Sequence, residues 1–467
     1  MSKVVIIGGG ISGLSTAYYL ARGGIPSTIV ESRPRLGGVI LTEHVEGCTL
    51  EAGPDSFLSI KPAALELIAS LGLSSEVIGS NDHLRVTFVR RRGRLVPLPD
   101  GLMMMVPTKI LPLLTTRLVG WGTKLRMGME LLRAPKPKPG DESVAEFIQE
   151  HYGAEAVDYL AEPLLSGIYG GDPAELSVTS VLPRFVELAN RYGSLTRGVL
   201  VERARAARRP AAPLFRTLKG GLGQLIEALT TAIRGQTDVL HARAQAVERA
   251  GAGFRVRLED GWLEAAHLVV ACEAHSGATL LASVDPRLAE LLTMVPYSSS
   301  MTVALGFDAA DFARLPSGFG FLVPKKERRR LVACTWVGTK FPHRVPDGKV
   351  VARCFLGGTG DAAALSESDD VIAAAVAEEL RAIAGVTARP RFTRISRWPR
   401  SMAQYTVGHP QRLAEIESRL TALPALHLAG NAYEGIGIPD CIRLGRRTAA
   451  HISGTGYETP KSPQAFG

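Results

Sequence analysis

Three glycines near the start of the chain have the spacing of a dinucleotide-binding loop. The apolar run Val4–Ile7 stops at Gly8, and Gly10 and Gly13 follow as a helical pattern begins. A second apolar run then ends in an acid, Glu31. In such a βαβ unit the glycines permit a tight turn, close approach to a pyrophosphate and close helix packing, and the helix start attracts the anion. We therefore expect a dinucleotide here, with Glu31 accepting hydrogen bonds from the ribose hydroxyls.

The residues after this acid favour FAD over a nicotinamide cofactor. Arg35 and the pair Gly37 and Gly38 follow in a loop, and Gly53 comes soon after. Nicotinamide domains usually continue from the acid into another helix, whereas a basic residue and a glycine pair suit a cofactor that continues past its pyrophosphate. No second G-x-G-x-x-G is present. We therefore expect no separate NAD(P) domain, and electrons that enter from an organic substrate and leave to oxygen or a quinone.

The end of the chain repeats the strand–glycine–helix pattern. The apolar run ending at Ala429 meets Gly430 and Asn431, and a helix is expected to start near Gly437, Ile438 and Pro439. With no second pyrophosphate to bind, the positive end of this helix could face the carbonyl edge of a flavin and stabilise its reduced form. The alternative is an ordinary terminal strand–helix unit with a glycine-rich loop.

Composition narrows the classes of partner and compartment. The chain has 467 residues, a formal charge of +9 and a pI of about 9.4, which favours anionic partners. No basic–aromatic module or zinc-ligand spacing supports nucleic-acid or metal binding. The five cysteines are scattered and odd in number, as expected in a reducing compartment. The first strand begins almost at Met1, and no apolar run could span a bilayer, so we expect a cytoplasmic protein.

The pattern of elements predicts an α/β fold. We expect a Rossmann-like FAD-binding domain interleaved with a mixed α+β substrate domain and a helical subdomain that contacts a membrane or covers the active site. The predicted FAD-binding parts are residues 1–80, 213–285 and 421–467. The predicted substrate domain is residues 81–100 and 286–420, and the helical subdomain is residues 101–212. Within these parts we expect a strand over 239–247 and a stiff proline-rich linker over 135–139.

Several stretches resemble the oxygen-dependent porphyrinogen oxidases of haem synthesis. The FAD fingerprint is shared by many flavoproteins, but two other stretches are much narrower: Pro163–Asp172 (PLLSGIYGGD), and Asn431–Gly435 (NAYEG) with Asp440 and Cys441. Further supporting stretches are Glu51–Leu58 (EAGPDSFL), and Gln404 and Tyr405 with Gly408 and His409. Together these stretches span nearly the whole chain.

The resemblance implies one non-covalent FAD and a tetrapyrrole substrate, a porphyrinogen, that gives hydride to the flavin. It implies O2 as the acceptor and H2O2 as the product. Gly167 is the expected substrate-positioning residue, through its backbone. The expected cofactor-binding residues are Gly8, Gly10, Ile11, Ser12, Gly13, Glu31, Ser32, Arg35, Gly37, Gly38, Gly53, Pro54, Asp55, Ser56, Val247, Trp398, Gly430, Asn431, Gly437, Ile438 and Pro439. The expected substrate-binding residues are Arg94, Leu98, Met104, Leu165 and Tyr169, and the basic candidates for the propionates are Arg94, Lys109 and Arg184.

Several alternatives stay open from the residues. Protoporphyrinogen is the favoured substrate and coproporphyrinogen III the alternative. Another flavin amine oxidase or a carotenoid desaturase, or a tetrapyrrole carrier without activity, are rivals from other classes. Residues 101–133 mix apolar and basic side chains, with no acid between Asp100 and Glu130. They would suit either an anionic membrane interface, and thus a peripheral location on the inner face of the cell membrane, or a buried helical lid. A homodimer is a further expectation.

Overall fold

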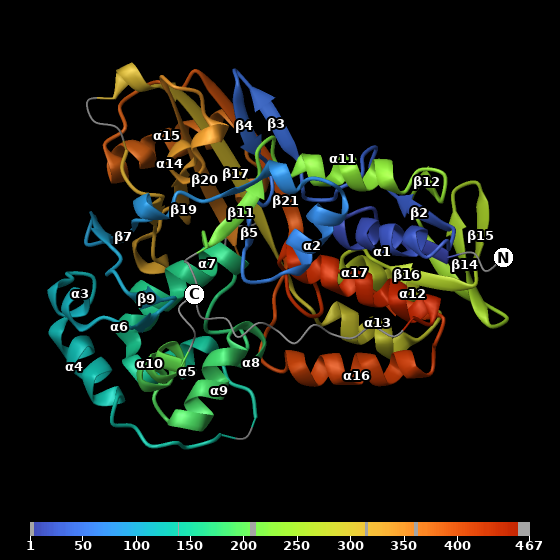
Figure 1. The fold of residues 1–467 in the computed structure, drawn as a ribbon, viewed down its shortest axis with the longest axis horizontal. Helices are drawn as coiled ribbons and strands as arrows, with labels where there is room; N and C mark the ends of the chain where they lie inside the picture. Colours follow the sequence, from blue (N-terminus) through green and yellow to red (C-terminus); the bar gives the residue numbers. More distant parts are fainter. Residues whose placement is uncertain (1–3, 139, 206–211, 313–315, 359–362, 456–467) are drawn as a thin grey trace. The chain divides into compact units, whose positions relative to one another are not determined.

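The computed structural model describes residues 4–138, 140–205, 212–312, 316–358 and 363–455. The chain divides into two compact units, each built from separated segments of sequence (Figure 1). Within the described residues, unit 1 comprises 4–79, 213–296 and 410–455, and unit 2 comprises 80–212 and 297–409. The sequence predicted boundaries between FAD-binding segments and the other segments of the chain after residues 80, 212, 285 and 420. The roles assigned to these parts stay predictions.

Unit 1 is organised around a parallel five-stranded sheet with the order β12-β2-β1-β16-β22. Each neighbouring pair in this sheet is parallel. The central strand β1 (Val4–Ile7) is completely buried, as expected for a strand covered on both faces. The other strands are β2 (Ser27–Glu31), β12 (Thr237–His241), β16 (His267–Val270) and β22 (Leu426–Leu428).

Helices α1 (Ile11–Arg22) and α17 (Ile438–Ser453) pack against each other along the sheet (Figure 1). At their crossing, a Cβ on Gly445 would lie 2.7 Å from the carbonyl oxygen of Ser12, so only a glycine permits this approach. Helix α11 (Gly223–Ala232) contacts α1, and α2 (Ala63–Ser70) contacts α17. A third set of contacts joins the small antiparallel sheet β13-β14-β15 to β1, β16 and the helix α12.

The remaining elements of unit 1 correct one sequence prediction. The strand expected over 239–247 is two strands in different sheets, because the chain leaves the parallel sheet after His241 and begins an antiparallel sheet at Ala246. The other elements are β3 (Thr42–Val45), β4 (Cys48–Glu51), β5 (Phe57–Leu58), β6 (Val77–Gly79), β11 (Phe215–Leu218), β13 (Ala246–Ala250), β14 (Gly253–Leu258), β15 (Gly261–Ala265), α12 (Ala274–Leu281), α13 (Pro286–Thr293) and α16 (His409–Thr421), which begins at the unit boundary.

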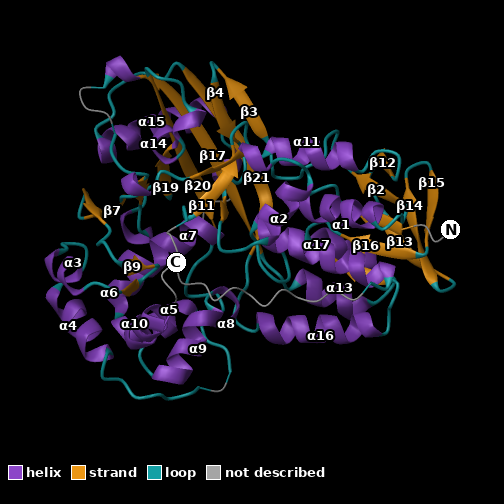
Figure 2. Ribbon diagram, viewed as in Figure 1, coloured by secondary structure: helices purple, strands orange, loops and turns teal. Residues whose placement is uncertain are grey.

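Unit 2 contains a seven-stranded sheet with the order β21-β17-β20-β19-β18-β7-β8, drawn in orange in Figure 2. Helix α15 (Asp369–Ala384) buries Ile372, Val376 and Leu380 in the same apolar core as side chains of β17, β19 and β20. The strands are β7 (Thr87–Arg91), β8 (Arg94–Pro97), β17 (Tyr297–Asp308), β18 (Gly320–Leu322), β19 (Ala333–Trp336), β20 (Lys349–Gly358) and β21 (Phe392–Ala403), and a short helix α14 (Val337–Lys340) follows β19.

The rest of unit 2 is mostly helical and begins with a short hairpin of β9 (Leu102–Met103) and β10 (Val106–Pro107). A π-helical turn over Val157–Ala161 leads directly into α7 (Glu162–Tyr169). Such wide turns are uncommon and occur often at functional sites. The other helices are α3 (Ile110–Thr115), α4 (Trp121–Glu130), α5 (Val144–Tyr152), α6 (Ala154–Ala156), α8 (Val178–Val181), α9 (Pro183–Tyr192) and α10 (Leu195–Arg205).

A buried carboxylate joins three of these helices. Glu130, at the end of α4, accepts hydrogen bonds from His151 Nδ1 of α5 (2.9 Å) and from Ser194 Oγ (2.7 Å) and the backbone N–H of Leu195 (2.6 Å) at the start of α10. Burial alone would raise the pKa of Glu130, but these hydrogen bonds outweigh it and hold that pKa below its ordinary range. Glu130 therefore acts as a charged cap that fixes α10 to α4 and α5.

No helix among the described residues is both long enough and apolar enough to cross a bilayer.

Three histidines of unit 1 lie together near the start of β16. His427 Nε2 of β22 is 3.4 Å from His267 Nδ1 of β16, and the ring of His451 in α17 is 5.4 Å from that of His427. Burial, together with the charges that His267 and His451 would carry, lowers the pKa of His427 to about 3. His427 is therefore neutral in the folded protein near neutral pH, whereas an unfolded chain protonates it below about pH 6.5.

This difference predicts a specific acid sensitivity. Between about pH 6.5 and pH 3 the unfolded chain binds a proton at residue 427 that the folded chain excludes, so the folded state loses about 1.4 kcal/mol per pH unit. His427→Gln should remove this term and reduce the loss on going from pH 7 to pH 5 by about 2 kcal/mol. The measurement is the thermal midpoint of the protein at both pH values. His343→Gln, at an exposed histidine of unit 2, is the control. Equal pH sensitivity of His427→Gln and the parent protein would contradict the assignment.

Candidate functional site

The parallel sheet of unit 1 brings the two ends of the sequence together. Strands β1, β16 and β22 are neighbours and run in the same direction, so the loops after Ile7, Val270 and Leu428 leave from one edge. A Cβ on Gly430 would lie 3.6 Å from the carbonyl oxygen of Cys272, which follows β16. In open α/β sheets, ligands bind at the carboxyl ends of the strands. The glycine motifs at the two chain ends therefore meet where a dinucleotide would bind.

Gly8 and Gly13 are required by close packing within the chain. A Cβ on Gly13 would lie 2.0 Å from the carbonyl oxygen of Gly8, so α1 can contact β1 this closely only with glycine at that position. Gly8 has a φ of 110°, and its added Cβ would lie 2.9 Å from backbone atoms of Ala271 and Cys272. These contacts place the start of α1 against the end of the sheet.

The start of α1 fits the pyrophosphate of a dinucleotide. Its N-cap residue, Gly10, offers no side-chain cap, and the first turn has no acid. An added Cβ on Gly10 would meet no described atom closer than Gly38 Cα, at 4.0 Å. The space is therefore open next to N–H groups that favour an anion, and Ile11 and Ser12 form the first turn.

Glu31 lies at the carboxyl end of β2, beside this helix start. Its carboxylate accepts hydrogen bonds from the backbone N–H of Gly9 (2.7 Å) and of Arg33 (2.8 Å), which fix its orientation. Each carboxylate oxygen can accept a further hydrogen bond, as ribose hydroxyls would require. Ser32 lies between Glu31 and Arg33, in the same turn.

Arg35 holds the glycine loop through its guanidinium group. It donates to the carbonyl oxygens of Leu36 (3.2 Å), Ile40 (3.1 Å) and Gly38 (2.6 Å). Burial lowers the pKa of Arg35 from its ordinary value. Gly37 in turn donates its N–H to the carbonyl oxygen of Gly9 (2.8 Å), so the loop lies directly against the first glycine cluster.

The start of α17 is adjacent to the start of α1. Cys441 forms a side-chain hydrogen bond with Ser12, and Gly437 is the N-cap of α17, ahead of Ile438 and Pro439. Asp440 in its first turn forms an ion pair with Lys61, in which Oδ2 and Nζ are 2.6 Å apart. This pair offsets the charge of the only acid in that turn, so the helix start keeps its preference for an anion. Sequence reasoning missed this pair, because the two residues are 379 positions apart and neither has a local signal.

The remaining cofactor candidates lie in separate places. Gly53, Pro54, Asp55 and Ser56 form the loop before β5, where Ser56 Oγ donates to Asp55 Oδ1 (2.6 Å). Val247 is buried in β13, and its carbonyl oxygen accepts a hydrogen bond from Ser283 (2.8 Å). Asn431 follows Gly430 after β22. Trp398 is on β21 of unit 2. Direct contact of each of these residues with FAD stays a prediction.

Gly167 is an exposed glycine inside α7 that the chain itself does not require. Its φ is not in the left-handed region, and an added Cβ would meet only Leu322 Cδ2, at an ordinary 3.5 Å. A glycine inside a helix costs about 1 kcal/mol relative to alanine. The open space beside Gly167 is therefore available to a molecule outside the chain, as its predicted role in positioning a substrate requires.

The other substrate candidates differ in environment. Leu165 is fully buried on α7, whereas Met104 is part-exposed and has a left-handed φ of 53° between β9 and β10. Leu98 follows β8, and Tyr169 ends α7. Of the basic candidates, Lys109 pairs with Asp100, and Arg184 pairs with Glu187 and Glu202. Arg94 is exposed on β8 and forms no ion pair with a described residue.

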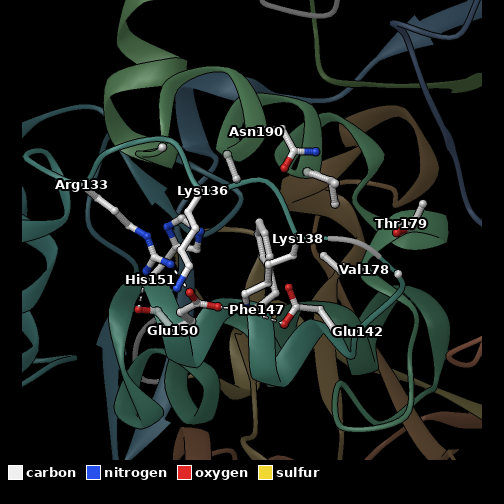
Figure 3. Close-up of a pocket in the computed structure, with 14 residues that line it drawn as sticks. Arg133, Lys136, Lys138, Glu142, Phe147, Glu150, His151, Val178, Thr179 and Asn190 are labelled. Carbon is white, nitrogen blue, oxygen red and sulfur yellow. Dashed lines mark hydrogen bonds and ion pairs between the residues drawn. The ribbon is translucent and has the colours of Figure 1, made fainter.

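A basic pocket in unit 2 is closed by its own ion pairs (Figure 3). Arg133 and Lys138 both reach the carboxylate of Glu150, and Lys138 also pairs with Glu142 at 3.2 Å. Part of the predicted proline-rich linker lines this pocket, while Pro139 lies outside the described residues. None of the predicted site residues lines it. We interpret the pocket as the place where the linker is fastened to α5. No group of three metal-ligating side chains in the described ranges is placed to hold a metal ion.

Comparison with known proteins identifies relatives over nearly the whole chain. The model of the family described as flavin containing amine oxidoreductase matches residues 11–453. A coproporphyrinogen III oxidase of Bacillus subtilis is 34% identical over 95% of this chain and 96% of its own length. A human protoporphyrinogen oxidase is 32% identical over 97% of this chain and 98% of its own length.

Solved structures support the same fold. A crystal structure of a protein from Exiguobacterium sp. 255-15 has a TM-score of 0.88 at 30% identity, covering 97% of this chain and 99% of the other. Putrescine oxidase with bound putrescine has a TM-score of 0.70 at 18% identity, with the same coverage, and shows the fold alone. The α/β fold expected from the sequence is confirmed, as is the expectation of a flavin-dependent oxidoreductase.

The two kinds of glycine in this site give a paired prediction. Gly10→Ala should fold, because the added methyl group meets no close atom of the chain, yet it should weaken FAD binding at least tenfold by occupying the cofactor's approach. Gly13→Ala should lower the thermal stability of the protein itself, because its Cβ collides with the backbone of Gly8. The measurements are bound flavin per protein and the thermal midpoint after flavin removal. A Gly10→Ala protein with full flavin content would contradict the proposed pyrophosphate position.

Proposed function

We propose that this chain, which belongs to the flavin containing amine oxidoreductase family, is a porphyrinogen oxidase with O2 as its electron acceptor. The observation that carries the proposal is near-complete alignment, at 31–34% identity, with relatives named coproporphyrinogen III oxidase and protoporphyrinogen oxidase. The chain is an oxidoreductase with FAD as its cofactor. When bound, FAD supplies a hydride acceptor that O2 can reoxidise.

The residues of the chain supply binding and orientation. The start of α1 would hold the pyrophosphate, and Glu31 would hold the ribose next to it. The start of α17, which the sequence pattern predicts to face the carbonyl edge of the flavin, would favour negative charge there. In unit 2, α7 offers the backbone at Gly167 to the substrate, where an absent side chain lets a bulky macrocycle approach. Oxidation of a porphyrinogen to a porphyrin removes six electrons, so it would need three two-electron transfers to FAD and three O2, which would give three H2O2.

Coproporphyrinogen III is the substrate we propose first. Relatives from Bacillus subtilis and Propionibacterium freudenreichii with this name are both 34% identical to the chain. This substrate carries more carboxylates than protoporphyrinogen, which suits a chain with a formal charge of +9. Arg94 is the candidate partner for a propionate, because it is exposed and its charge is not used in an ion pair with any residue of the described ranges. Protoporphyrinogen IX, which the sequence analysis favoured, is the second candidate, and a human relative carries that name.

Anaerobic mixing of the holoprotein with each porphyrinogen tests the reaction and the substrate together. We expect coproporphyrinogen III to bleach the flavin absorbance, and admission of O2 to restore it with porphyrin fluorescence and H2O2. Arg94→Gln should raise KM for coproporphyrinogen III about tenfold, because one charge-assisted contact to a propionate is lost, with little effect on flavin content. Bleaching by protoporphyrinogen alone would select the second candidate. Bleaching by neither, with putrescine or a carotenoid active instead, would refute porphyrinogen oxidation.

We also propose that α3 and α4 form a peripheral contact with an anionic membrane. Trp121, Leu125, Met129 and Leu132 recur at helical spacing through α4 and the turn after it, and their exposed fractions are 71, 65, 57 and 83%. Ile110 and Leu111 of α3 are also exposed, at 73 and 71%. The opposite side of α4 is buried, so the helix is apolar on a face that its own fold does not use.

Basic residues accompany this surface. Arg117 and Arg126 are its nearby cations in sequence, and the segment lacks acids between Asp100 and Glu130, while Lys109 is already paired with Asp100. Lys124 is different, because it is buried and donates to the carbonyl oxygens of Leu114 and Thr116 (2.7 Å each), which joins α4 to the end of α3. An apolar face beside cations suits the headgroup region of an anionic bilayer. The chain would then meet a poorly soluble tetrapyrrole at a surface where it accumulates.

Flotation with vesicles tests this membrane proposal. The holoprotein should float with vesicles containing phosphatidylglycerol at low salt and bind less at high salt, whereas Leu125→Glu should reduce flotation several-fold. Trp262→Glu, at an exposed aromatic residue on β15 of unit 1, is the matched control and should still float. Absence of flotation at low salt would rule out the membrane contact. Sedimentation of the same samples tests the further proposal of a homodimer.

A further inference from the structure

Helix α7, which carries Gly167, is fixed at both ends by buried polar side chains. It starts directly after a π-helical turn, Val157–Ala161, and ends at Gly170 in the left-handed conformation. Between these ends, Gly167 and Ile168 are exposed, while Leu165 and Ser166 are buried. The helix thus presents one face outward and anchors the other.

The first anchor is an ion pair at the start of α7. The buried carboxylate of Glu162 accepts a hydrogen bond from Arg328 Nη2 at 2.7 Å and one from Ser166 Oγ at 2.6 Å. Its other oxygen accepts the backbone N–H of Lys325 at 2.9 Å. The exposed fractions of the Glu162 and Arg328 side chains are 10 and 18%, so solvent screens their interaction little. Glu162 therefore ties α7 to the turn that contains residues 325–328.

The same turn reaches both the far end of α7 and its middle. Lys325 Nζ pairs with Asp172 Oδ2 at 2.7 Å, two residues beyond the left-handed Gly170. Leu322, which ends β18 just before the turn, is the residue beside the open position of Gly167. Arg328 also donates to the carbonyl oxygen of Val323 (3.0 Å), which holds the turn in shape. A shift of this turn would therefore move the surroundings of Gly167.

The second anchor is the amide of Gln404 at the end of α7. Its Nε2 lies 2.7 Å from the carbonyl oxygen of Tyr169, 2.9 Å from Ser298 Oγ and 3.0 Å from the carbonyl oxygen of Met402. Gln404 is 2% exposed. Two of these three neighbours are carbonyl oxygens that can only accept, so the NH2 group must face them.

The carbonyl end of Gln404 explains the next glycine. Its Oε1 is buried and has no hydrogen-bond partner in the described part of the chain. A Cβ on Gly171 would lie 2.1 Å from this oxygen, so the side chain fills the space that a residue other than glycine would need. An apolar side chain of similar length would avoid the unpartnered oxygen but could not hold the carbonyl of Tyr169. The position therefore favours hydrogen bonding to α7 over simple filling of the core.

We propose that Glu162, Arg328 and Gln404 are positioning residues, which act by holding the backbone at Gly167 where it meets the substrate. This inference rests on the proposed function, since it assigns the residues a role in porphyrinogen oxidation. None of the three needs to touch the substrate. Each acts through α7, either at its start or at its end. A misplacement of about 1 Å at a reacting centre can reduce a rate a hundredfold, so rigid anchors on this helix would directly affect turnover.

The test compares two conservative variants with a matched control. Arg328→Lys keeps the charge but loses the geometry of the guanidinium, and Gln404→Met keeps the length but loses the donor. Each should lower kcat with the preferred porphyrinogen at least tenfold, with less than a threefold change in KM and in flavin content. Arg330→Lys alters a nearby arginine that forms an ion pair with Glu367 (2.6 Å), and this variant should keep parental kcat.

A combined variant separates positioning from general damage. Gly167→Ala should itself lower kcat, because its methyl group occupies the space offered to the substrate. If Arg328 acts through Gly167, the double variant Gly167→Ala/Arg328→Lys should lose much less than the product of the two single losses. The inference would be overturned if the loss of kcat in the double variant equals the product of the two single losses. It would also be overturned if Arg330→Lys loses as much kcat as Arg328→Lys. Parental kcat in both Arg328→Lys and Gln404→Met would overturn it as well.

The proposed function fails in a different way from this inference. If the parent holoprotein is not bleached by either porphyrinogen, the reaction is wrong and the anchors have no such role. If the parent is bleached and turns over while the anchor variants match it, only the inference fails. Thermal midpoints of all variants are measured in parallel, and a fall in kcat that disappears when samples are compared at equal folded fraction would also overturn it.

Discussion

The close contact between α1 and β1 is the constraint on which the rest of unit 1 depends. A Cβ on Gly13 would be 2.0 Å from the carbonyl oxygen of Gly8, so any residue other than glycine there would push the helix away from the strand. This brings the uncapped start of α1 to the carboxyl edge of the sheet. Helix α17 then packs on α1 by a second glycine contact, at Gly445, and its own start comes to the same edge. Two backbone contacts thus place both helix termini that favour an anionic cofactor.

The missing side chains of glycine serve two opposite purposes in this protein. At Gly13 and Gly445 the space is taken by atoms of the same chain, and the glycine allows the fold to close. At Gly10 and Gly167 an added Cβ would make only one ordinary contact each with the described atoms, with Gly38 Cα at 4.0 Å and Leu322 Cδ2 at 3.5 Å, although alanine would suit either backbone. Glycine has a lower helix propensity than alanine, so Gly167 lowers the stability of α7 although packing of the chain does not require glycine there. That contrast separates the glycines that packing of the chain requires from those that it does not, and the predicted substrate-positioning residue Gly167 is in the second group.

Local patterns in the sequence predicted the elements of unit 1 well, because its strands are apolar runs ended by glycine or an acid. Such patterns correctly predicted β1, α1, β2 and the start of α17. The run 239–247 was misread as one strand, since alternation continues through a break between two different sheets. The Lys61–Asp440 pair and the anchors of α7 had no local signal, because each joins segments far apart in sequence. The role of Gly167 was predicted from resemblance to a family, and only the structure shows which atoms lie beside it.

The order of the sheet in unit 1 has a consequence for biosynthesis. β22 and α17 come from the final segment of unit 1, yet they complete a sheet and a helix pair begun by β1 and α1. A ribosome makes nearly all of unit 2 before it makes residue 426. Until then β16 has an unpaired edge, and a nascent chain with such an edge is prone to join other chains. A chain stopped before that point would also lack the helix start that faces α1. The predicted cofactor site thus becomes complete only after β22 and the start of α17 have been made, so flavin retention reports on synthesis of this segment as well as on folding.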